Sequence, residues 1–102
     1  MEEELLRIIN KYGINKQLRK FNEEAFELQE AITTNELKQS VEYEIPLTEI
    51  VGTREHIAEE IADVTVMLEQ FRLYYGINKE DVEKVMQYKI NRQIYRIESE
   101  EK

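Results

Sequence analysis

Residues 57–68 read IAEEIADVTVML, a stretch in which apolar or small side chains occupy most helical faces and the only charges are Glu59, Glu60 and Asp63. A helix that is apolar on most of its faces is typical of a buried helix. No Lys or Arg lies within one turn of these three acids, and a buried carboxylate is costly unless something compensates its charge. The stretch therefore predicts a central helix whose carboxylates bind a cation.

A second acidic motif precedes this helix. Residues 23–27 read EEAFE, so that Glu24 and Glu27 have the same spacing as Glu60 and Asp63. Side chains three residues apart lie on one helical face, with Cβ atoms about 5–6 Å apart. Two such pairs on facing helices surround a hard cation with oxygen, and Mg²⁺ suits a site that also takes waters and substrate phosphates. The two motifs predict a metal site, whereas a solvated acidic face without any ligand is the simpler alternative.

The helix boundaries follow from a turn sequence that occurs twice. Residues 12–16 read YGINK, and residues 75–79 read the same five letters. Gly favours the left-handed conformation that ends a helix, and Asn favours the N-cap of the next helix. Thr53 is the predicted N-cap of the third helix. Together with the apolar spacing, these signals predict helices at about residues 2–12, 16–35, 54–75 and 79–99.

Apolar stripes predict which faces of the second and third helices form the core. The first stripe is Leu18, Phe21, Ala25, Leu28 and Ile32, and the second is Ile57, Ile61, Val64, Leu68, Phe71 and Tyr75. Between them, residues 41–48 alternate apolar with polar side chains, which predicts an extended crossover, with a short hairpin as the alternative. We expect one all-α domain over residues 1–102, a four-helix bundle-like fold with a thin core that oligomerisation completes.

Composition limits the partners. The chain of 102 residues has 22 acidic and 14 basic residues and a net charge of −8, which disfavours a nucleic-acid partner. The absence of cysteine excludes disulfides and thiolate metal sites. The acidic start MEEELLRIIN differs from a signal peptide, and no apolar run approaches the roughly 18 residues of a membrane span. We expect a cytoplasmic protein without a membrane partner.

The two acidic motifs, followed by a helix with basic residues, resemble the MazG-type all-α nucleoside triphosphate pyrophosphohydrolases over about residues 16–96. The resemblance implies a Mg²⁺ cofactor, which Mn²⁺ can replace, and a homodimer or homotetramer. It implies hydrolysis of a nucleoside triphosphate to a nucleoside monophosphate and pyrophosphate. Carried over by position, it implies Glu24, Glu27, Glu60 and Asp63 as metal ligands and Lys89, Arg92 and Arg96 as substrate-binding residues. Glu23 and Glu59 are accessory candidates for the catalytic general base, with an additional metal ligand or a solvent-facing side chain as the alternatives.

The base specificity stays open in the sequence. Phe26, Tyr88 and Tyr95 are candidates either for stacking on a base or for the core. The lone His56 is expected at a structural or rim position. The basic residues of the fourth helix share one face, which is also compatible with an ordinary solvated strip.

Two other functions remain open. Phosphoribosyl-ATP pyrophosphohydrolase resembles the same family in fold and in its acidic helices. A non-enzymatic helical interaction module would carry its acids only for solubility and would bind no divalent ion beyond weak surface association. A di-iron carboxylate bundle is excluded, since it requires Glu-x-x-His on paired helices and this chain has a single His.

Overall fold

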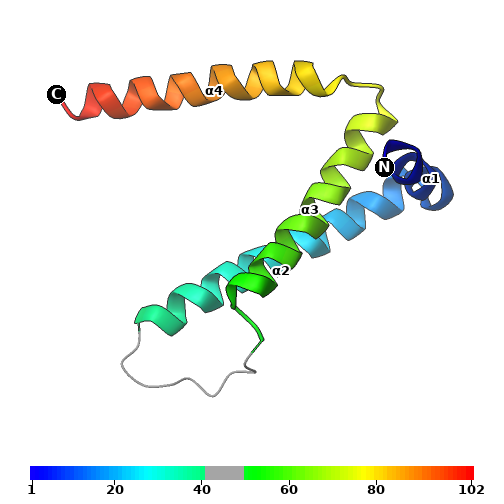
Figure 1. Cartoon of the computed structure of the whole chain (residues 1–102), viewed down its shortest axis with the longest axis horizontal. Helices are drawn as coiled ribbons and strands as arrows, with labels where there is room; N and C mark the ends of the chain where they lie inside the picture. The colour runs from blue at the N-terminus through cyan, green and yellow to red at the C-terminus, as the bar shows by residue number, and fades with distance from the viewer. Residues whose placement is uncertain (41–49) are drawn as a thin grey trace.

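The structure, a computed structural model, describes residues 1–40 and 50–102. These residues form helices α1 (Glu2–Tyr12), α2 (Ile14–Ser40), α3 (Arg54–Tyr74) and α4 (Lys79–Glu100), as Figure 1 shows. The described part contains no strand, which confirms the all-α prediction for it. The crossover predicted at residues 41–48 lies outside the described residues.

The turn signals placed most helix ends correctly. Gly13 and Gly76 both have positive φ, at 88° and 65°, which is the conformation that glycine allows at low cost. The Thr53 hydroxyl accepts a hydrogen bond of 3.1 Å from the backbone N–H of His56, so the predicted N-cap of α3 is confirmed. The predicted cap at Asn15 is wrong, because α2 already begins at Ile14.

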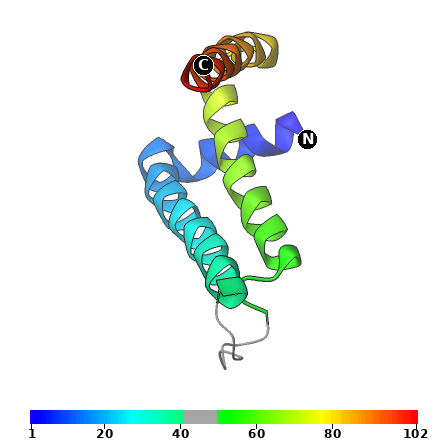
Figure 2. The ribbon, with the colours of Figure 1, turned by 90° about the vertical axis from the view of Figure 1, so that its left-hand side faces the viewer.

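Three helices pack together. Figure 2 shows α2 and α3 running side by side in opposite directions, with α1 crossing them near the start of α2 and the end of α3. The buried apolar residues of the described chain come from all three of these helices: Leu5 and Ile9 of α1, Ala31 of α2 and Met67 of α3. The thin core that was predicted is therefore present.

The packed faces of α2 and α3 match the predicted stripes only in part. Phe21 and Phe71, one from each stripe, pack edge to face with ring centroids 5.7 Å apart. On α2, Leu18 and Ile32 remain 46% and 45% exposed, and on α3, Ile61 and Leu68 remain 49% and 51% exposed. Because each of these helices is covered by only two others, part of each stripe has no neighbour. The prediction that residues 57–68 are buried on most faces is wrong for the single chain. The buried positions of the helix pair include polar residues instead: Gln17, Glu60 and Gln70.

Helix α4 projects away from the other three helices (Figure 1), and none of its residues is buried. Its apolar side chains are about half exposed, among them Val85 and Met86 at 53% and Ile90 at 50%. A helix of this kind gains little stability from packing within one chain. Within the described residues, no helix is both long and apolar enough to cross a membrane.

Candidate metal centre

Three carboxylates meet between α2 and α3. One oxygen from each of Glu24, Glu60 and Asp63 lies within 4.8 Å of the other two. Glu24 comes from α2, while Glu60 and Asp63 lie three residues apart on α3 and thus on one face. The antiparallel packing of the two helices therefore brings together three of the four residues predicted as metal ligands.

Two of these carboxylates are largely removed from water. The side chain of Glu24 is 12% exposed and that of Glu60 is 11% exposed. The Oε2 atoms of both are buried and have no hydrogen-bond partner among the described residues. A buried acceptor without a partner costs about 1–3 kcal/mol, and more when it is charged. A hard cation bound by these oxygens would remove that cost, so the residues present fit a divalent metal ion.

The other oxygens of the two glutamates have partners that orient them. Lys20 Nζ lies 3.3 Å from Oε1 of Glu24. His56 Nε2 lies 3.3 Å from Oε1 of Glu60, and His56 Nδ1 accepts a hydrogen bond from the backbone N–H of Gly52. Since Nδ1 is an acceptor, Nε2 carries the proton of a neutral imidazole and presents this N–H side to Oε1 of Glu60. Because Lys20 and His56 contact only the Oε1 atoms, the Oε2 atoms of Glu24 and Glu60 stay available to a metal ion.

The electrostatics of the group oppose its ionisation in the absence of metal. Burial raises the pKa of Glu24, and the charges of Asp63 and Glu27 raise it further, while the hydrogen bond from Lys20 lowers it. Burial likewise raises the pKa of Glu60, with added contributions from Glu27 and Asp63. Like charges that share a desolvated site favour the protonated form, and a bound cation reverses that preference.

The remaining predicted carboxylates lie outside this group of three. Glu27 is exposed, but its charge is close enough to raise the pKa of Glu60. It lines, with His56 and Glu60, a cavity of about 280 Å³. Glu23 and Glu59 are exposed, and within the described chain neither belongs to the group.

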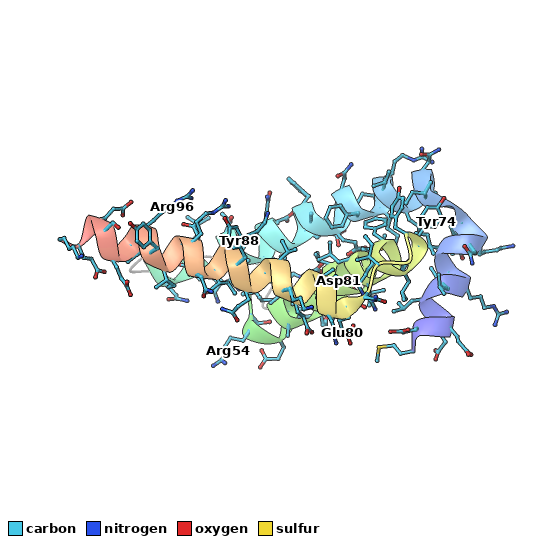
Figure 3. All side chains as sticks on the ribbon, turned by 90° about the horizontal axis from the view of Figure 1, so that it is seen from above. Arg54, Tyr74, Glu80, Asp81, Tyr88 and Arg96 are labelled. Carbon is cyan, nitrogen blue, oxygen red and sulfur yellow. The ribbon has the colours of Figure 1, made fainter. Side chains whose placement is uncertain are left out.

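Helix α4 does not bring its basic residues to the carboxylates within one chain. Lys89, Arg92 and Arg96 are exposed on the projecting helix, and Figure 3 labels Arg96 near its C-terminal end. The Arg92 guanidinium lies over the Tyr88 ring, 5.8 Å from its centroid. The core alternative for the three candidate aromatic residues is wrong within the described chain, because all of them are exposed: Phe26, Tyr88 and Tyr95.

Comparisons of the chain with protein-family models, with curated proteins and with solved structures give no match.

Sequence reasoning missed four residues beside the carboxylates or assigned them no specific role. Lys20 and His56 each precede a buried glutamate by four residues, and that spacing places them on the same helical face. It was a usable signal. Gln17 and Gln70 gave none, because they meet only through tertiary packing, where Gln17 Nε2 donates a hydrogen bond of 2.8 Å to Gln70 Oε1 across 53 residues of sequence.

Proposed function

We propose that this chain is a Mg²⁺-dependent hydrolase that converts a nucleoside triphosphate to a nucleoside monophosphate and pyrophosphate. The observation that carries the proposal is the pair of buried, unpartnered Oε2 atoms of Glu24 and Glu60, on two side chains that each bring one oxygen within 4.8 Å of an oxygen of Asp63. Oxygen ligands of this kind suit Mg²⁺, which keeps positions for water and phosphate. The likeness of the two acidic motifs to those of the MazG-type enzymes supports the same function.

Glu24, Glu60 and Asp63 would hold the metal, with Glu27 beside them as a further ligand. When bound, Mg²⁺ supplies neutralisation of phosphate charge and a water of lowered pKa. Lys20 and His56 keep the two buried glutamates oriented through their Oε1 atoms.

Proton transfer and charge stabilisation are the further tasks of the chain's own residues. Glu23 and Glu59 are exposed at the edges of the two motifs, where either can accept a proton from an attacking water. Lys16 and Lys20 line the cavity beside the carboxylates and can meet phosphate oxygens from within the same chain. The predicted cations of α4 require a second chain.

The active form that we propose is a homo-oligomer, in which α4 of one copy covers α2 and α3 of another. Residues 84–96 of α4 carry four cations, Lys84, Lys89, Arg92 and Arg96, and no acid. The α2–α3 pair is acidic around its metal centre and leaves apolar residues such as Leu68 about half exposed. Complementary charge and uncovered apolar surface on both sides favour this contact. It would bring the predicted phosphate-binding residues to the carboxylates.

The test is Mg²⁺-dependent release of pyrophosphate from a panel of common and modified nucleoside triphosphates. We expect pyrophosphate with at least one of them, loss of activity in Glu60→Gln, and full activity in Glu36→Gln, which neutralises an exposed glutamate at the far end of α2. Release of orthophosphate would contradict the proposal. An absence of divalent-ion binding by calorimetry would instead favour the non-enzymatic interaction module.

A further inference from the structure

A cavity of about 450 Å³ adjoins the metal centre between α1, α2 and α3. Glu24 and Asp63 belong both to the lining of this cavity and to the group of three carboxylates. Its volume falls within the range of about 300–1,000 Å³ that is usual for small-molecule sites. A ligand whose phosphates lie at the carboxylates therefore has room for its remaining part in the same continuous space.

The lining of this cavity is apolar on several sides and carries an amide pair. Ile8 of α1 and Val66 and Met67 of α3 supply apolar surface, and Tyr12 supplies a half-exposed aromatic ring. Flat apolar rings bind well between such side chains. The polar groups of the lining include the buried side-chain amides of Gln17 and Gln70 and the ammonium groups of Lys16 and Lys20. The combination matches a flat, polar-edged ring joined to a polyanion.

Gln17 and Gln70 are 3% and 1% exposed and line this cavity. Gln17 Nε2 donates a hydrogen bond to Gln70 Oε1. Gln17 Oε1 accepts no hydrogen bond among those of the described residues, and Gln70 Nε2 donates only a long one of 3.8 Å, to the Met67 sulfur. A thioether is a weak acceptor, so the pair keeps one acceptor and one donor for a ligand.

We propose that this cavity binds the base of the nucleotide and that Gln17 and Gln70 read its hydrogen-bonding edge. The inference rests on the proposed function, since it places the triphosphate at the carboxylates. If the terminal amides of Gln17 and Gln70 both flip, Gln70 becomes the donor and Gln17 the acceptor of their mutual hydrogen bond. The free donor then lies on Gln17 and the free acceptor on Gln70. The pair thus suits both the amino edge of adenine and the carbonyl edge of uracil. A polyphosphate without a base has no donor for the free acceptor and therefore cannot use both groups.

The first experiment measures binding to the full chain by calorimetry in the presence of Mg²⁺. The probes are α,β-methylene ATP, α,β-methylene UTP and inorganic triphosphate. We expect wild type to bind both nucleotide analogues about tenfold or more tighter than triphosphate. Val66→Phe, which fills the cavity, should remove this difference. Asn10→Phe, at an exposed position of α1 outside the lining, should keep it.

Equal affinity of wild type for the three probes would overturn the base site while leaving hydrolysis of the phosphoanhydride intact. Binding of none of them would overturn both the base site and the proposed function. A base preference that survives in Val66→Phe would overturn the location of the site.

The second experiment separates recognition from a purely structural role of the two glutamines. Replacing both, as Gln17→Met with Gln70→Met, removes the pair without leaving one buried amide unpaired, so we expect the fold to persist. The double variant should lose about tenfold of the preference for the analogues over triphosphate. A lower melting temperature with an unchanged preference would show a structural pair only and would overturn the recognition role.

Discussion

His56 Nε2 lies 3.3 Å from Oε1 of Glu60, one helical turn away on α3. The backbone N–H of Gly52 fixes the imidazole from its other side through Nδ1. His56 thus contacts one oxygen of Glu60 while the other, Oε2, is buried without a partner, and we infer that His56 is a positioning residue for the proposed metal centre.

We predict that His56→Phe weakens Mg²⁺ binding about tenfold, because losing a side chain that holds a metal ligand in place typically lowers metal affinity by about that factor. His56→Gln keeps a donor and should retain more of the affinity. Calorimetric titration of Mg²⁺ into both variants checks this. Affinity in His56→Phe equal to that of wild type would remove His56 from the centre.

The raised pKa values of Glu24 and Glu60 predict how stability depends on pH without metal. Burial is the largest cause in both cases. Because the folded pKa exceeds the ordinary value of 4.5, the folded state binds more protons than the unfolded state between these two values. The favourable contribution is therefore fully present below the ordinary value and is lost as pH rises through the folded pKa.

We expect the difference in free energy of unfolding between Glu60→Gln and metal-free wild type to grow in favour of the variant as pH rises above the ordinary pKa of 4.5 and through the raised pKa of folded Glu60. Chemical denaturation in the presence of a chelator measures it at each pH. A difference that stays constant with pH would show that Glu60 is not desolvated in the folded protein.

Asp63→Asn tests the linkage between metal binding and stability. At free Mg²⁺ ten times its dissociation constant, wild type should gain about 1.4 kcal/mol, or several degrees in melting temperature. Asp63 is exposed, so its neutralisation relieves repulsion without loss of packing. The variant should be at least as stable as wild type without metal and should gain nothing from Mg²⁺. Marked destabilisation of the metal-free variant would reveal a structural partner of Asp63.

Mixing two inactive variants tests whether Arg92 acts in a partner's site. Arg92→Ala should raise KM or lower kcat strongly, and Asp63→Asn should abolish activity. If Arg92 serves the neighbouring copy in a dimer, random reassociation of equal amounts restores intact sites to about a quarter of the wild-type number. Activity is measured after joint unfolding and refolding of the two variants. Mixtures no more active than the average of their components would place Arg92 in its own chain's site or outside any site.

Two glycines with positive φ should respond differently to alanine. At Gly13 a Cβ would meet nothing within 4 Å, so only backbone strain opposes Gly13→Ala, at about 1–3 kcal/mol. At Gly52 a Cβ would lie 2.9 Å from the backbone nitrogen of Asn35. We expect Gly52→Ala to lower the free energy of unfolding more than Gly13→Ala does. If denaturant melts show equal losses in the free energy of unfolding for the two variants, the close contact between a Cβ at position 52 and Asn35 of α2 is relieved at little cost.

Local signals in the sequence determined the helices and most of their ends, although α2 runs over Ile14–Ser40 where about 16–35 was predicted. The YGINK turns at 12–16 and 75–79 contain glycines whose positive φ the structure confirms, and Thr53 caps α3 through its own hydroxyl. The acidic pairs could also be recognised in advance, since residues three apart on a helix always share a face. These features depend on neighbours within one turn, and one turn of sequence is enough to specify them.

Tertiary packing decided which faces meet. The apolar stripes predicted Leu18 and Leu68 inside, yet both remain about half exposed, while Gln17 and Gln70 are buried between the helices. Helix periodicity defines an apolar flank but not the rotation at which two helices dock, because that rotation depends on all helices competing for the same surface. The cavity beside the carboxylates and the separation of α4 from them follow from this docking, which residues distant in sequence determine jointly.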